Sequence, residues 1–157
     1  MVRQTRVINF FAGPGAGKST TAAGLFHQMK LNGELVELVT EYAKDLTYEN
    51  NEAILSNQLA ILGEQFHRVH RLLGHVDWVI TDSPLLLGPL YARGVFQKAW
   101  FLAAAFGAFE VFDNTNIVLK RTKPYVTTGR TQTEDEAMHV DNKVEAMLEA
   151  LNIPFNT

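Results

Sequence analysis

The stretch that decides the fold is Ala12-Gly13-Pro14-Gly15-Ala16-Gly17-Lys18-Ser19-Thr20. It has the spacing of a Walker A motif, with Ala12 in place of the usual first glycine. The run before it, Val7 to Ala12, is apolar, as in a strand that is buried on both faces of a sheet. The segment after it, Lys18 to Leu31, has apolar residues at helical spacing and is followed by Asn32-Gly33, a good helix stop. A strand, a glycine-rich loop and a helix in this order predict a phosphate-binding loop.

The chemistry of this loop suits a nucleoside triphosphate with magnesium. Its glycines let the backbone of Gly13 to Thr20 turn N–H groups toward phosphate oxygens, and the helix N-terminus adds a positive dipole. Lys18 is expected to reach the β- and γ-phosphates, and the Ser19 hydroxyl is expected to bind Mg²⁺. We therefore expect ATP and Mg²⁺ as cofactors, with residues 13–20 as the nucleotide-binding residues.

Asp82 is the candidate for the second magnesium-binding residue. It ends the apolar run Asp77 to Asp82, which is where a Walker B carboxylate belongs, and there it would hold the metal through water. The alternative is that Asp82, followed by Ser83-Pro84, simply caps the next helix.

Apolar patterns in the rest of the chain alternate between strands and helices. The expected strands are 7–12, 34–39, 77–82, 117–119 and 153–155, and the expected helices are 18–31, 51–73, 85–92, 95–109 and a final helix that opens with a capping box at Thr133 and Glu136. Such alternation indicates a parallel sheet wound by right-handed crossovers. We expect an α/β fold in three layers, with a central parallel sheet of about five strands, helices on both faces, and a single domain over residues 1–157.

Composition and charge narrow the classes of function. The net charge of -3 argues against a protein that coats nucleic acid non-specifically, and the absence of cysteine excludes disulfides and thiolate metal sites. Because no signal peptide pattern follows Met1, a cytoplasmic location is expected, in the host if the source is a phage. The apolar stretch 99–109 is too short to span a membrane. It predicts a buried helix, with a homodimer interface as the alternative.

Several segments, in this order, resemble the P-loop kinases of nucleosides and nucleotides, a group that includes thymidylate kinases, deoxynucleoside kinases and nicotinamide riboside kinases. They are the phosphate-binding loop, Thr40-Glu41-Tyr42-Ala43, Gln58, Thr81-Asp82-Ser83-Pro84 and the basic stretch 120–130. The resemblance covers nearly the whole chain. It implies a P-loop kinase fold and an enzyme that transfers the terminal phosphoryl group of ATP to an acceptor hydroxyl.

The resemblance also implies an acceptor site beside the end of the second strand. Glu41 is there the candidate general base, which takes or orients the acceptor hydroxyl proton. Its alternative role is an exposed helix cap. Gln58 resembles the glutamine that reads a pyrimidine edge in deoxynucleoside kinases, with the solvated surface of a helix as its alternative, and Tyr42 is a further candidate substrate contact.

The basic segment at about 120–133 lies where these kinases carry a mobile lid. Arg121 and Arg130 are the candidates for neutralising charge on the transferred phosphoryl group, because a guanidinium fork matches phosphate oxygens. Tyr125 is a candidate contact to the acceptor. A solvated basic loop is the alternative for the whole segment.

The pieces Lys123-Pro124-Tyr125, Gly129-Arg130 and 133–137 resemble small P-loop kinases of bacteriophages. Some of these phosphorylate 5-hydroxymethyluracil within DNA, a step toward hypermodified thymidine, and the resemblance implies this acceptor. A free nucleoside, a nucleotide or nicotinamide riboside remain alternatives. From another class, a P-loop NTPase switch that acts with a protein partner stays open. Family members place an adenine-contacting loop after the last strand, so we expect an open adenine pocket or a shortened chain.

Overall fold

The computed structural model describes residues 2–128, 130 and 132–157. Its sheet has four parallel strands in the order β2-β3-β1-β4. They are β1 (Arg6–Phe11), β2 (Val36–Val39), β3 (Trp78–Thr81) and β4 (Asp113–Val118). Val7 of the central strand pairs with Val79 on one side and with Asn114 on the other. The predicted α/β class and parallel sheet are confirmed, with four strands rather than about five.

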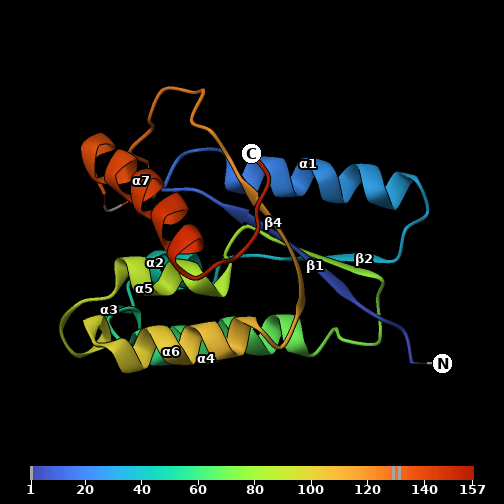
Figure 1. Ribbon diagram of the computed structural model, residues 1–157. Helices are drawn as coiled ribbons and strands as arrows, with labels where there is room; N and C mark the ends of the chain where they lie inside the picture. The colour runs from blue at the N-terminus through green and yellow to red at the C-terminus, as the bar shows by residue number, and fades with distance from the viewer. Residues whose placement is uncertain (1, 129, 131) are drawn as a thin grey trace.

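Helices cover both faces of the sheet (Figure 1). They are α1 (Lys18–Leu31), α2 (Tyr42–Tyr48), α3 (Glu52–Leu55), α4 (Gln58–His70), α5 (Gly88–Tyr91), α6 (Ala99–Phe109) and α7 (Glu134–Ala150), with 3-10 turns η1 (Leu85–Leu87) and η2 (Gly94–Gln97). Ile8 and Phe10 of β1 pack under α1, while Val7 and Phe11 point to the opposite face, into the core formed by α4, α6 and α7. This alternation along one strand produces the three predicted layers.

The last strand expected at residues 153–155 is reduced to one bridge. Asn156 pairs with Ile117, and the two segments exchange Val118 N–H to Asn156 O at 2.8 Å and Asn156 N–H to Asn116 O at 2.9 Å. Pro154 has no backbone N–H to donate to a longer ladder. The predicted fifth strand is therefore replaced by a single bridge.

Strand β4 begins four residues before the predicted 117–119, because its polar start conceals it. Asn114 and Asn116 lie in this strand, and the buried Asn9 of β1 donates to their side-chain oxygens at 2.8 and 3.1 Å. An amide that is paired across the sheet can occupy a strand position that looks too polar for burial.

Three predicted helices are divided in the structure. Residues 85–92 form the 3-10 turn η1 and the short helix α5. Residues 51–73 form α3 and α4, because Asn57 accepts a hydrogen bond from the Ala60 N–H at 3.3 Å and so starts a new helix. Residues 95–109 form η2 and α6, separated by Lys98 in an extended conformation. The predicted capping box is confirmed at the start of α7.

Helix α6 buries one stripe rather than every face. Phe101, Ala105 and Phe109 are buried, whereas Trp100 is 44% exposed. The expectation of a helix hidden on all sides was therefore wrong for this chain on its own. Across the described ranges of the chain, no helix is both long and apolar enough to cross a membrane.

Candidate active site

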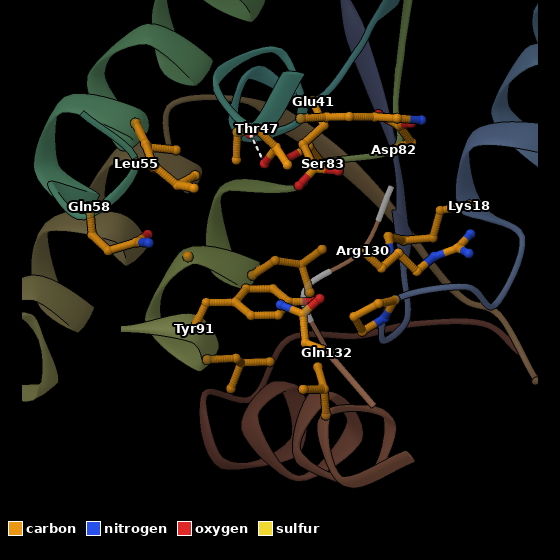
Figure 2. Close-up of a pocket in the computed structure, with 18 of the residues that line it drawn as sticks. Lys18, Glu41, Thr47, Leu55, Gln58, Asp82, Ser83, Tyr91, Arg130 and Gln132 are labelled. Atoms are coloured by element: carbon orange, nitrogen blue, oxygen red, sulfur yellow. Dashed lines mark hydrogen bonds between the residues drawn. The ribbon is translucent and has the colours of Figure 1, made fainter. Parts of the chain in front are cut away.

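A cavity of about 980 Å³ lies where β1, β2 and β3 end. The carboxyl edge of a parallel sheet is the usual place for a ligand in an α/β fold. The predicted site residues that line this cavity are Pro14, Gly15, Gly17, Lys18, Ser19, Thr20, Glu41, Gln58, Asp82 and Arg130. Figure 2 labels Lys18, Glu41, Gln58, Asp82 and Arg130 among them. Its walls come from segments that are far apart in the sequence: the phosphate-binding loop, the helices α2 to α5, and α7.

The phosphate-binding loop has the backbone conformation that its glycines allow. Gly15 and Gly17 have φ angles of 75° and 100°, in the left-handed region, and α1 begins directly afterwards at Lys18. The Lys18 ammonium group donates to the carbonyl oxygens of Ala12 and Gly13 at 2.9 and 3.0 Å. Lys18 is thus folded onto its own loop, from which it can turn toward a phosphate.

Burial lowers the pKa of Lys18 below its ordinary value of 10.5, and the carboxylates of Glu41 and Asp82 act in the opposite direction. The same surroundings act inversely on Glu41: burial raises its pKa above the ordinary 4.5, Lys18 lowers it, and Asp82 raises it. Glu41 follows β2, Asp82 follows β3, and Lys18 opens α1 after the loop that follows β1. All three line the same cavity, so they share one electrostatic environment.

Asp82 follows β3 and is 5% exposed. Its Oδ1 has no hydrogen-bond partner among the described residues, and no capping bond runs from its side chain to η1. A buried carboxylate oxygen without a partner costs free energy unless a ligand satisfies it. Mg²⁺ prefers oxygen ligands and keeps several waters, so Asp82 and the Ser19 hydroxyl in the same cavity fit this ion. Outside residues 1, 129 and 131, no cluster of three His, Cys, Asp or Glu residues offers an all-protein metal site.

Glu41 lies at the N-cap of α2, yet its side chain makes no capping hydrogen bond within the described structure. It lines the cavity instead. The backbone around it is held by Gln65 of α4, a residue that the sequence analysis did not select. The sequence did contain one sign that Gln65 is buried: it lies among apolar neighbours on one face of its helix.

The two predicted lid arginines have different surroundings. Arg121 does not line the cavity: its Nε donates to Asp141 Oδ2 at 2.9 Å, and its Nη2 donates to the Pro14 carbonyl at 2.8 Å. Arg130 lines the cavity and stacks on Tyr125, with 5.6 Å between the guanidinium carbon and the ring centre. Gly129 and Thr131, also in the predicted lid, lie outside the described residues.

The two tyrosines predicted to contact the acceptor do not line the cavity. Tyr125 covers Gly15, where an added Cβ would lie 3.0 Å from the ring, and its hydroxyl donates to the Gln132 carbonyl at 2.6 Å. The Tyr42 ring packs under Arg68 of α4, 4.8 Å from the guanidinium carbon. Both tyrosine side chains therefore contact other parts of the protein.

Apolar side chains from α3, α4, η1 and α5 line part of the cavity, beside polar ones such as Thr47, Glu52 and Gln97. The apolar residues are Leu55, Ile61, Leu62, Leu85, Leu87 and Leu90. Gln58, the first residue of α4, lies beside Gly88, where an added Cβ would be 3.6 Å from the Gln58 side-chain oxygen. Tyr91, missed by the sequence analysis, also lines the cavity, and burial raises the pKa of its hydroxyl, so that it stays protonated. Apolar side chains beside the Gln58 amide and the Tyr91 phenol suit a planar polar molecule.

Comparisons with known proteins agree with this fold. The family model described as "AAA domain" matches residues 7–157, and no curated protein matches the chain. Thymidylate kinase from Ehrlichia chaffeensis is a similar solved structure, with 17% identity, a TM-score of 0.66, and coverage of 98% of this chain and 86% of that one. Deoxyadenosine kinase from M. mycoides, solved with dCMP and dCDP, has 17% identity, a TM-score of 0.57, and coverage of 95% and 88%. APS kinase from Mycobacterium tuberculosis, solved with AMPPNP and APS, has 14% identity, a TM-score of 0.52, and coverage of 97% and 78%. At these identities the similarity establishes the P-loop kinase-like fold.

Proposed function

This chain belongs to the AAA-domain family, and we propose that it is an ATP-dependent kinase that transfers the terminal phosphoryl group to a hydroxyl group of an acceptor. The observation that carries the proposal is the shared environment of Lys18, Asp82 and Glu41 in one cavity. A phosphate-binding loop and a metal carboxylate are enough for hydrolysis. A second, partly buried carboxylate, Glu41, in the same roomy cavity supports transfer to a hydroxyl.

Each residue then has a definite role. Lys18 leaves the Ala12 and Gly13 carbonyls to bind the β- and γ-phosphates, while Ser19 and Asp82 hold Mg²⁺. The metal, when bound, supplies neutralisation of the charge that develops on the phosphate oxygens. Glu41 orients the acceptor hydroxyl and takes its proton, and its raised pKa brings it closer to the pH at which a general base works best. Arg130 contributes positive charge from the lid.

For the acceptor we propose a nucleoside-type molecule, and specifically the hydroxymethyl group of 5-hydroxymethyluracil in phage DNA, a step of thymidine hypermodification. The slot beside Gln58 supports a heterocycle, because an amide offers one donor and one acceptor to a base edge. Lys44, Arg93 and Lys143 also line the cavity, and their positive charges suit contacts with the phosphates of a DNA backbone. A free nucleoside, a nucleotide or nicotinamide riboside is the alternative.

The test is to incubate the protein with ATP and Mg²⁺ and with each acceptor in turn, including 5-hydroxymethyluracil DNA, and to measure the gain of one phosphate by mass spectrometry. Lys18→Ala is the control and should abolish the gain. If no acceptor gains mass while ATP is hydrolysed faster with a protein partner, the NTPase-switch class replaces the kinase.

We also propose that the exposed side of α6 meets a second copy of the chain. Ala103, Ala104 and Gly107 are exposed there beside Trp100, and no charge lies between Lys98 and Glu110. Light scattering measures the molar mass of the wild type and of Ala103→Glu. We expect a dimer for the wild type and a monomer for the variant, and a monomeric wild type would contradict the proposal.

A further inference from the structure

Gln65 is one of the few buried polar side chains outside the predicted set, with 3% of its surface exposed. Its Oε1 accepts a hydrogen bond from the Tyr42 N–H at 2.9 Å, and its Nε2 donates to the Thr40 carbonyl at 3.1 Å. These two backbone groups belong to the residues immediately before and after Glu41. One amide from α4 therefore holds the chain on both sides of the candidate general base.

The start of α2 receives a hydrogen-bond acceptor from another helix. The first N–H groups of a helix need acceptors, and the side chain at the N-cap normally supplies one. Glu41 occupies the N-cap of α2 without making such a bond. Gln65 accepts from the N–H of Tyr42, the first residue of the helix, whereas an N-cap side chain accepts from the second or third. The Glu41 side chain makes no capping bond within the described structure, and it lines the cavity.

Arg68, almost one turn further along α4, holds the same helix in a different way. It donates to Asp45 at 3.0 Å and to Glu64 at 3.1 Å, and it packs over the Tyr42 ring. These contacts dock the body of α2, but they do not touch the backbone on either side of Glu41. Arg68 is therefore a matched control for a residue that only supports the helix.

We infer that Gln65 is a positioning residue for phosphoryl transfer: its amide fixes the backbone of Thr40 to Tyr42 so that the Glu41 carboxylate faces the acceptor hydroxyl. This inference rests on the proposed role of Glu41. Gln65 also lines the cavity, but both ends of its amide are bonded to the backbone of Thr40 and Tyr42, so we expect the affinity for ATP not to depend on it.

The test compares Gln65→Met, which removes both hydrogen bonds at similar volume, with Gln65→Glu, which keeps the acceptor for Tyr42, and with Arg68→Met. We expect Gln65→Met to lower kcat about 10- to 100-fold, because a misplacement of about 1 Å can cost about 100-fold, while KM for ATP stays unchanged. Gln65→Glu should lower kcat by a smaller factor. Arg68→Met should reduce stability with little change in kcat.

Each variant is then made again in the Glu41→Gln background. If Gln65 acts through Glu41, Gln65→Met has little further effect there, since residues that act as one unit are not additive. An equal loss in both backgrounds, or an unchanged kcat in Gln65→Met, overturns the positioning role. Full turnover in Glu41→Gln alone removes the general-base role, and the positioning role falls with it. If Gln65→Met does not fold, Gln65→Glu carries the same comparison.

Discussion

Asp141 of α7 accepts a hydrogen bond from the backbone N–H of Gly13 at 2.6 Å, so the last helix holds the start of the phosphate-binding loop. The other oxygen of the same carboxylate accepts from Arg121, which in turn donates to the Pro14 carbonyl. Three segments that are distant in the sequence, residues 13–14, 121 and 141, meet at one carboxylate. The loop is therefore supported from outside the cavity as well as by its own glycines.

Removing this carboxylate should destabilise the fold. Asp141→Ala leaves the Gly13 N–H and the Arg121 Nε without their acceptor, and we expect a loss of about 2–4 kcal/mol in the free energy of unfolding. The control is Glu145→Ala, one turn further along α7, which breaks the exposed pair with Lys120 and should lose less than about 1 kcal/mol. Urea denaturation measures both. Equal losses would show that Asp141 is only a surface residue.

The first glycine of the loop is required for a steric reason. A Cβ on Gly13 would lie 2.4 Å from the Ala137 carbonyl oxygen and 2.7 Å from Asp141 Oδ1. Gly13→Ala should therefore cost about 1–3 kcal/mol, as overpacking does, and should weaken nucleotide binding by displacing the loop from α7. Gly24→Ala is the matched change, because nothing lies within 4 Å of its Cβ position in α1. The free energy of unfolding of this control should increase by about 0.5–1 kcal/mol. Thermal unfolding and ATP titration of both variants decide the point.

The features that could be predicted from sequence are those whose cause is local. The glycine spacing and the apolar strand before Lys18 define the phosphate-binding loop, and α1 has the predicted bounds 18–31. Thr133 and Glu136 cap α7 as predicted, because both partners lie within one turn. The missed break at Asn57 is local too, but the apolar spacing of 51–73 continues across it and conceals it.

The features that could not be predicted depend on distant partners. Arg121 and Arg130 are alike in sequence, and only the position of Asp141, 20 residues after Arg121, draws one of them away from the cavity. The apolar neighbours of Gln65 on α4 indicate burial, but its hydrogen-bond partners lie at the start of α2, a helix that was not predicted. Composition cannot show such pairings, because they arise from packing between separate elements.

The two lid arginines should therefore give opposite results. Arg130→Gln is expected to lower kcat about 100-fold or more, because a charge beside the transferred phosphoryl group acts mainly in the transition state, with less than about 1 kcal/mol of lost stability. Arg121→Gln should lose about 1.5–3 kcal/mol of stability, because its bonds to Asp141 and Pro14 hold the fold. Turnover is compared well below each melting temperature. A larger loss of kcat in the Arg121 variant would reverse the two roles.

Glu41 should make the protein less stable at neutral pH than a neutral side chain would. Burial raises its pKa above the ordinary 4.5, so the folded state binds this proton more tightly than the unfolded state does. The resulting contribution to stability is fully present below the unfolded pKa of 4.5 and is lost as the pH rises through the folded pKa. The side chain of Glu41→Gln does not titrate, so this variant does not lose that contribution to stability as the pH rises.

The free energy of unfolding of Glu41→Gln, minus that of the wild type, should therefore increase as the pH rises above about 4.5, by about 1.4 kcal/mol for each unit of pKa elevation. Urea denaturation of both proteins between pH 5 and pH 8 measures this difference. Glu49→Gln, at the exposed end of α2, is the control for removing one negative charge from that helix. The same Glu41 variant should lose turnover, so activity and stability move in opposite directions at one position. A difference that stays flat or falls toward pH 8 would mean that Lys18 already compensates the Glu41 charge and that the pKa of Glu41 is not raised in the folded protein.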